Sequence, residues 1–266
     1  MLTGKNRIST DKFYTNENIV DICFKHFIPF IDDSALLIEP SAGNGAFLTH
    51  LKAYPYLAFD IEPEHPSIIT QDFLNLDLDS FNQPLMFIGN PPFGKQSSIA
   101  KKFIKHITKC PLTTTLGFIF PKSFKKESMQ KCFPLQYWLV KQIDLPNNAF
   151  NIAGNIHNVP CVFQIWQKKE KKRVIAPYPL SKFFDFVKIH DNPDFSLRRV
   201  GVYAGKLDDN IQKSIQSHYF IKIKTGLKLE TFSNLYNTIN FTHDNTAGPK
   251  SISKKEFILA INQLLL

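Results

Sequence analysis

Short apolar runs alternate with amphipathic segments through about the first two thirds of the chain. The runs have the length of strands and are bounded by Gly, Pro or acidic residues, which is typical of strands buried in a sheet. We expect them at the start of residues 36–48 and at residues 56–61, 84–89, 116–120 and 159–166. Helical spacing occurs at residues 19–23 and 99–107, and residues 135–145 form another amphipathic stretch that ends with strand-like character. This alternation favours an α/β fold with a doubly wound, mostly parallel sheet and a site at the carboxyl ends of its strands.

The last third of the chain has a different pattern. A charged run at residues 168–173, followed by two prolines, is typical of an exposed connector. Beyond it, strand character occurs at residues 183–189, 198–203 and 218–224, and helical spacing at residues 232–239 and 254–265. Ser253 precedes Glu256 by three positions, a capping-box pattern that predicts the start of the final helix. We therefore expect two domains, residues 1–172 and a small α+β region at residues 173–266.

The most informative motif is Asn90-Pro91-Pro92-Phe93, directly after the expected strand at residues 84–89. An exocyclic amine of a nucleobase is a poor nucleophile, and two hydrogen-bond acceptors at one point improve it. The side-chain oxygen of Asn90 and the carbonyl of Pro91 can supply them, because consecutive prolines hold the backbone still. Phe93 offers a face on which a base removed from a duplex can stack. The alternative interpretation is an ordinary turn after a strand.

A glycine-rich turn lies upstream, between the apolar run and the helical spacing of residues 36–48. Gly43 and Gly45 let the backbone approach a ligand closely, and Glu39 can hold a polar group of that ligand. Acidic residues follow at the ends of the next two expected strands, as Asp60 and Asp72. Such folds hold ribose hydroxyls at the first of these positions. A glycine-rich turn by itself is often only a βα turn, but here it is followed by both acids.

In content and order, these segments resemble the S-adenosylmethionine-dependent N6-adenine DNA methyltransferases. In the group concerned, the cofactor motifs precede the catalytic motif and a specificity region comes last. The resemblance covers about the first two thirds of the chain. It implies a Rossmann-like methyltransferase fold whose sheet ends in an antiparallel hairpin, and S-adenosyl-L-methionine as the cofactor. Phe93 departs from the Tyr that is frequent in the family, and the C-terminal region is smaller than many specificity domains.

The resemblance also implies roles for individual residues. The segment at residues 13–16 helps to hold the methionine end of the cofactor, Asp60 its ribose and Ile61 its adenine, while Asp72 accepts from the adenine amino group beside the aromatic face of Phe73. The expected cofactor residues are Tyr14, Thr15, Glu39, Pro40, Ser41, Gly43, Gly45, Asp60, Ile61, Asp72, Phe73 and Asn90. The expected catalytic residues are Asn90, Pro91, Pro92 and Phe93.

Substrate contacts are expected from both regions. Lys95 and Lys122 follow strand ends on the same rim as the catalytic motif, where they meet phosphates or are simply solvated. Phe150 occupies the place where the family has a second aromatic against the flipped base. In the C-terminal region, the pair Arg198 and Arg199 can follow a nucleic-acid backbone. The sequence around this pair loosely resembles a glycine-containing strand of target-recognition domains.

Composition agrees with a nucleic-acid partner. The 266-residue chain has 32 Lys and Arg against 23 Asp and Glu, a formal net charge of +9, which favours a polyanion. No segment has the length and apolarity of a membrane span, and the N-terminus lacks a secretory apolar core. We therefore expect no membrane association, and a soluble intracellular protein, in the cytoplasm or wherever its substrate resides. The four cysteines lack metal-ligand spacing and are expected as reduced thiols, and no metal is assigned.

The sequence thus predicts an enzyme that methylates the N6 amino group of adenine in nucleic acid, with DNA favoured over RNA. Adenine methylation in RNA is the leading alternative, because the same tetrapeptide serves there. Methylation of a protein glutamine amide also uses such a site, although residues 13–16 and the Glu-Pro start of the glycine turn disfavour it. A binding module that keeps the pocket without catalysis is the alternative from another class.

Overall fold

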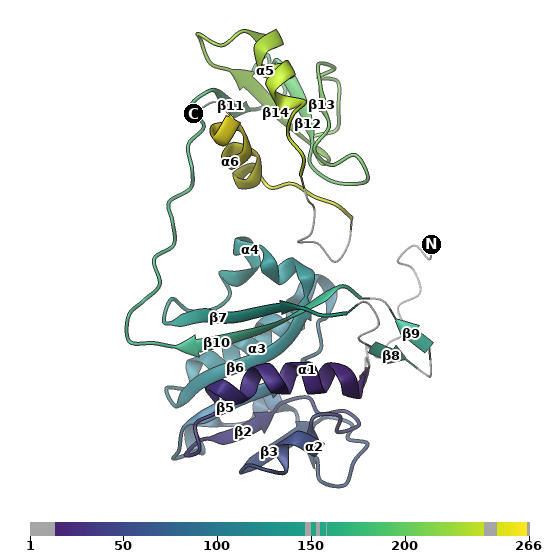
Figure 1. The fold of residues 1–266 in the computed structure, drawn as a ribbon, viewed down its shortest axis with the longest axis vertical. Helices are drawn as coiled ribbons and strands as arrows, with labels where there is room; N and C mark the ends of the chain where they lie inside the picture. Colours follow the sequence, from purple (N-terminus) through teal and green to yellow (C-terminus); the bar gives the residue numbers. More distant parts are fainter. Residues whose placement is uncertain (1–13, 147–149, 153–154, 158, 242–248, 265–266) are drawn as a thin grey trace. The chain divides into compact units, whose positions relative to one another are not determined.

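Two compact units make up the chain, Met1–Val174 and Ile175–Leu266, and each is described by itself (Figure 1). The computed structural model describes residues 14–146, 150–152, 155–157, 159–241 and 249–264. A seven-stranded sheet organises the first unit and a four-stranded sheet the second. Both sheets carry helices, so the fold is mixed α/β as expected.

The large sheet has the strand order β4-β3-β2-β5-β6-β10-β7. Strands β4 to β6 are parallel, whereas β10 runs antiparallel to both of its neighbours. Central parallel strands with an antiparallel final hairpin form a Rossmann-like methyltransferase fold, which confirms the expected fold class. Its strands are β2 (Leu36–Glu39), β3 (Tyr56–Asp60), β4 (Ile69–Thr70), β5 (Leu85–Gly89), β6 (Thr113–Pro121), β7 (Tyr137–Asp144) and β10 (Cys161–Lys168).

Alternate residues of the central strands enter two cores, one on each face of the sheet. Leu37 and Met86 pack with helix α1 (Glu17–Phe27) in the first core, while Ile38 and Phe87 pack with helix α3 (Ser98–Lys109) in the second. Burial on both faces explains why these strands are continuous apolar runs. Figure 1 shows α1 and α3 on opposite faces. Two shorter helices, α2 (Leu48–Leu51) and α4 (Glu127–Gln130), complete the unit together with 3-10 turns.

A small sheet joins the start of the described chain to the loop after β7. Its order is β1-β8-β9, formed by β1 (Tyr14–Thr15), β8 (Phe150–Ile152) and β9 (Asn155–His157). Thr15 pairs with Phe150 in the antiparallel register of β1 and β8. The N-terminal segment is therefore fixed beside the second half of the large sheet. Phe13, included in the expected cofactor segment, lies outside the described residues.

Two expectations about the end of the first unit need correction. Residues 137–144 form a strand throughout, although only the end of the amphipathic stretch was expected to have strand character, because β7 pairs with β10 from Tyr137 to Asp144 with one register shift. The charged run is exposed through Lys172, but Arg173 is anchored to the core. Its guanidinium lies over the ring of Trp166 at 5.3 Å, and Nη2 donates to the carbonyls of Gln130 and Phe133. A long cationic side chain can pack its stem and still satisfy its charge.

The second unit is an antiparallel sheet of order β11-β14-β12-β13 with two helices on one face. The expected strand at residues 198–203 is wrong, because β12 ends at Arg198. A turn follows, in which Gly201 and Gly205 have φ values of 100° and 96°. The capping box is confirmed: Ser253 N donates to Glu256 Oε2, and Glu256 N to Ser253 Oγ. The elements are β11 (Phe184–Val187), β12 (Phe195–Arg198), β13 (Leu207–Asp208), β14 (His218–Ile223), α5 (Leu229–Tyr236) and α6 (Lys254–Leu264).

Two further expectations concern the four cysteines, expected as reduced thiols, and the absence of a membrane span. Cys23, Cys110 and Cys161 are buried free thiols, and Cys132 is a half-buried one. Within the residues that the structure describes, every helix is too short or too polar to cross a membrane.

Candidate active site

The strand order creates a crevice between β2 and β5. From β2 the chain builds β3 and β4 on one side and then returns to place β5 on the other side. Ligands bind at the carboxyl ends of the strands that flank such a reversal. Glu39 ends β2, and Asn90 follows β5 directly. A pocket lies here, lined by Tyr14, Thr15, Glu39, Ser41, Ala42, Gly43, Asn44, Ala46, Phe47 and Asn90.

The glycine turn forms one wall of this pocket. Gly43 and Gly45 have φ values of +51° and +84°, which side-chain-bearing residues rarely adopt. A Cβ at Gly45 would meet Leu48 Cδ1 at 2.7 Å and His65 Cβ at 3.3 Å, so a larger residue there would displace its neighbours. Asp60 fixes the turn from the neighbouring strand, because its Oδ2 accepts a hydrogen bond of 2.8 Å from Gly43 N. Asp60 and the glycine turn are therefore one unit of structure.

Tyr14 covers the same turn from the small sheet. An ideal Cβ at Gly43 would lie 3.9 Å from Tyr14 Cε1, so the ring is next to the turn. The hydroxyl of Tyr14 donates to Glu64 Oε1, and Glu64 N donates to Gly43 O at 2.9 Å. Sequence reasoning missed Glu64, because a carboxylate in an exposed loop carries no distinguishing pattern. The contact of Glu64 with Tyr14 explains why Tyr14 stays beside the glycine turn.

Glu39 is the main electrostatic feature of the pocket. Its side chain is 2% exposed, and among the described residues its Oε2 has no hydrogen-bond partner. Burial, with a smaller contribution from the charge of Asp60, raises the pKa of this carboxyl to about 8. Buried polar atoms are normally paired, so an orphaned carboxyl oxygen at a pocket wall is suited to a ligand donor. A cationic donor would suit it best, since it favours the ionised form.

The expected catalytic motif meets the expected cofactor segment through Asn90. Its Nδ2 donates to Thr15 Oγ1 at 3.2 Å, which fixes the amide, and Ser41 Oγ donates to its backbone carbonyl at 3.3 Å. Pro91 is buried, Pro92 is half-buried, and the half-buried ring of Phe93 packs against the first core. Three segments that are distant in sequence thus meet at Asn90, as the expected site requires.

The backbone is strained immediately after this motif. Gln96 and Ser97 have φ values of 53° and 59°, although neither is glycine. Gly94 has a φ of +65°, and a Cβ there would meet Ile99 Cγ1 at 2.5 Å. Residues held in this region cost of order 1–3 kcal/mol each and cluster at functional sites. The sequence around Gln96 contains no pattern that predicts this strain.

Part of the expected cofactor set lies elsewhere. The ring of Phe73 is 1% exposed and stacks on Phe103 at 5.6 Å, so the expectation of an open aromatic face needs correction. Asp72 caps the turn η2 (Phe73–Asn75), accepting from Leu74 N at 3.0 Å. Ile61 is 66% exposed beside Asp60, and Pro40 is buried between β2 and the glycine turn. Ile61 therefore offers the open apolar surface that Phe73 lacks.

The expected substrate residues are dispersed. Lys95 is exposed, whereas Lys122 forms an ion pair of 3.3 Å with Asp144. The backbone of Phe150 pairs with Thr15, and its side chain lies outside the described residues. In the second unit, Arg199 donates to Gln216 O and lies 5.5 Å from the ring centroid of Tyr219, while Arg198 lines a separate pocket.

Comparison with known proteins gives likenesses of structure only. No family model and no curated protein matches the chain. A Pyrococcus horikoshii protein assigned as an RNA methyltransferase is 12% identical, with a TM-score of 0.47, covering 62% of this chain and 90% of that one. The 23S rRNA methyltransferase ErmE is 14% identical, with a TM-score of 0.44, covering 62% of this chain and 73% of that one. A Vibrio vulnificus protein assigned as a modification subunit of a type I restriction enzyme is 11% identical, with a TM-score of 0.46. The match covers 97% of this chain and 62% of that one.

Proposed function

We propose that this chain is an S-adenosylmethionine-dependent methyltransferase that acts on the N6 amino group of adenine in nucleic acid, with DNA as the favoured substrate. The observation that carries the proposal is the meeting of Asn90, Thr15 and Glu39 around one pocket at the strand-order reversal. The net charge of +9 supports a polyanionic substrate.

The pocket fits the cofactor through its own residues. The orphaned oxygen of Glu39 suits the ammonium group of the methionine part, and the glycine turn allows close approach. Asp60 stands at the strand end where ribose hydroxyls are held in such folds, and Ile61 presents an exposed apolar side chain beside it. The cofactor supplies an activated methyl group on its sulfonium.

The catalytic motif acts by positioning the amine. Asn90 Oδ1 and the carbonyl of Pro91 accept hydrogen bonds from the two N–H groups, which moves electron density to the nitrogen. The nitrogen would form its bond to the methyl carbon in one displacement as the carbon–sulfur bond of the sulfonium breaks and leaves a neutral thioether, and it would afterwards lose one proton to solvent. Phe93 offers its ring to the base. No covalent enzyme intermediate is needed, so positioning and electrostatics carry the catalysis.

The test is transfer of tritiated methyl groups from S-adenosylmethionine to single- and double-stranded DNA and RNA of matched sequence, followed by nucleoside analysis. The expected product is N6-methyldeoxyadenosine. A labelled ribonucleoside alone would move the proposal to RNA. Label on protein glutamine, or cofactor binding without transfer to any nucleic acid, would contradict it.

A further inference from the structure

The second unit contains a pocket of its own, lined by Arg198, Tyr203, Lys206, Asp208, Lys213 and His218. The sheet register explains this grouping. Arg198 pairs with His218 across β12 and β14, and Ser196 pairs with Asp208 across β12 and β13. Residues two apart on a strand share a face, so these four polar residues gather on one side of the sheet. Phe195 and Leu197 point to the other side, into the core with α5 and α6.

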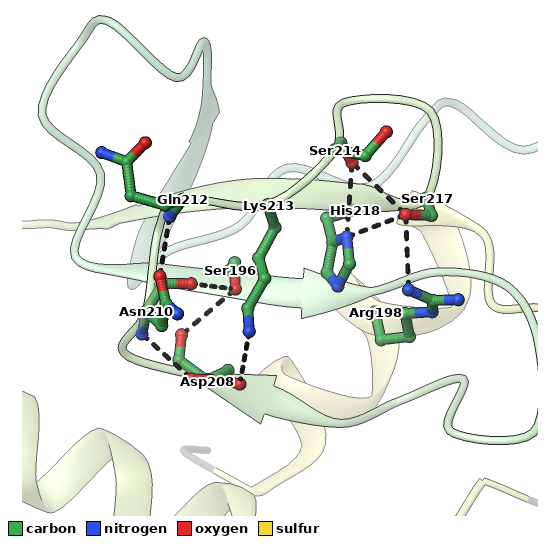
Figure 2. A network of polar contacts seen from close by, with 9 residues as sticks. All are labelled: Ser196, Arg198, Asp208, Asn210, Gln212, Lys213, Ser214, Ser217 and His218. Carbon is green, nitrogen blue, oxygen red and sulfur yellow. Dashed lines mark hydrogen bonds and ion pairs between the residues drawn. The ribbon is translucent and has the colours of Figure 1, made fainter.

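The loop between β13 and β14 is tied down over this polar face (Figure 2). Asp208 Oδ1 accepts from Asn210 N at 3.0 Å, and Ser196 Oγ donates to Asn210 O at 2.8 Å. Lys213 crosses back from the loop to pair with Asp208 at 3.2 Å. At the far end, Ser217 Oγ lies 3.0 Å from His218 Nδ1. The pocket wall is therefore held in place by its own side chains before any ligand binds.

Charge in the pocket is unbalanced. Three permanent cations, from Arg198, Lys206 and Lys213, face the single carboxylate of Asp208. Lys213 is paired with that carboxylate, but among the described residues Lys206 makes no ion pair and no side-chain hydrogen bond. Arg198 donates from Nε to Val200 O at 2.8 Å and from Nη1 to Ser217 Oγ, so the guanidinium is held in place at the pocket wall.

Two further observations point to the kind of ligand. Burial lowers the pKa of His218, and the charges of Arg198 and Lys213 lower it further against the opposing effects of the Ser214 hydrogen bond and the charge of Asp208, so the His218 ring is surrounded by charged groups. Tyr203 is 71% exposed although it lines the same pocket. A ring beside a cluster of cations is the combination with which proteins hold a nucleic-acid backbone and stack a base.

We propose that this pocket binds a phosphodiester group of the nucleic-acid substrate, with Arg198 and Lys206 on the phosphate and Tyr203 stacked on an adjacent unpaired base. This inference rests on the proposed function for the identity of the ligand. The binding itself needs neither the cofactor nor methyl transfer, so it can be tested separately.

The test uses the full chain and two variants, Lys206→Ala and Tyr203→Ala. Binding of a fluorescent single-stranded oligodeoxynucleotide is followed by anisotropy over a series of NaCl concentrations. Lys206→Ala should lower the slope of log K against log salt by about 0.7, the value for one lost contact to a single strand. Tyr203→Ala should weaken binding about fivefold or more with the slope unchanged, because stacking does not release counterions.

Lys228→Ala is the matched control, since Lys228 is an exposed lysine of the same unit that does not line the pocket. It should leave the affinity nearly unchanged. If Lys206→Ala and Tyr203→Ala melt like the parent and bind with its affinity and slope, the inference is wrong. The inference would also be wrong if Lys206→Ala, Tyr203→Ala and Lys228→Ala all lowered the affinity for the oligonucleotide equally. The loss would then reflect a general change of charge or surface rather than the pocket.

Methyl transfer by the parent chain, assayed in parallel, keeps the two proposals apart. Transfer to nucleic acid together with unchanged binding in the pocket variants would overturn the pocket and leave the proposed function standing. Pocket-dependent binding without any transfer would support the pocket and contradict methylation of nucleic acid.

Discussion

Asp60 and Asp72 have similar local geometry but different neighbours. Asp60 accepts from Gly43 N, in the glycine turn that lines the pocket of the first unit, and from Glu62 N, whereas Asp72 accepts from Leu74 N and caps a turn elsewhere. Both residues therefore stabilise the fold. Only Asp60 is bonded to the glycine turn, so under the proposed function it is the acid that would hold the ribose.

We expect Asp60→Ala to weaken S-adenosylmethionine binding by roughly 1–3 kcal/mol, because the cofactor loses a charged acceptor and the glycine turn loses its anchor. Asp72→Ala is the matched control and should lower the melting temperature without changing cofactor affinity. Titration calorimetry on both variants measures the difference. Equal losses of affinity would show that Asp72 also holds the cofactor, as the family resemblance first suggested.

Glu39 makes the stability of the protein depend on pH. Its folded pKa of about 8 lies above the ordinary value of 4.5, so the unfolded carboxyl ionises first as the pH rises. The contribution of protonated Glu39 to the free energy of unfolding is therefore complete below about pH 4.5 and is lost as the pH rises through about 8. Glu39→Gln should therefore unfold with a free energy higher by on the order of 2 kcal/mol at pH 7. Denaturant titrations at pH 5 and pH 8 check this, and an equal effect at both values would contradict it.

At the scale of elements, β1 links the two halves of the site. Its pairing with β8 fixes Thr15, and Thr15 in turn accepts the hydrogen bond from Asn90 Nδ2. Thr15→Val keeps the shape but removes the acceptor, so the Asn90 amide would lose its fixed orientation. We expect kcat to fall by about tenfold, the effect of roughly 1.4 kcal/mol on the barrier.

Thr15→Ser provides the matched control, because it keeps the hydroxyl and should recover most of the lost kcat. Steady-state kinetics with saturating cofactor separate the effect on kcat from that on KM. If Thr15→Val instead weakens cofactor binding and leaves kcat unchanged, β1 serves the cofactor alone.

Sequence predicted the central strands well for a physical reason. Strands such as β5 and β6 are buried on both faces and must be continuous apolar runs, which are visible without a structure. Strand β7 is half-exposed, so its mixed pattern indicated strand character only at its end, and pairing with β10 makes the whole segment a strand. Likewise, the ring of Phe73 is interior because Phe59, Phe87 and Phe103 pack around it. Such contacts depend on tertiary structure rather than on local sequence.

The candidate site follows the same division. The glycine turn, Glu39 and Asn90 were predicted because their chemistry requires particular residue types at particular strand ends. Glu64 and the strained Gln96 were not, since any polar residue in a loop would look the same in sequence. Local motifs thus identify the chemistry, whereas the residues that support it emerge only from the fold.

At the scale of the whole molecule, the proposed function assigns different work to the two units. The first holds the cofactor pocket and the catalytic motif, and the second holds the cationic pocket with Tyr203. Changes in the second unit should therefore affect binding of nucleic acid, and changes around Asn90 should affect the transfer step. This division makes the transfer step the place to test the central claim.

The most direct measurement is single-turnover transfer of tritiated methyl groups by the full chain carrying Asn90→Ala. Loss of a preorganised polar group of this kind costs on the order of a hundredfold in rate or more. We therefore expect transfer to fall by at least about a hundredfold, while S-adenosylmethionine affinity and melting temperature stay close to those of the parent. A folded Asn90→Ala protein that methylates adenine at nearly the parent rate would contradict the assignment of the site.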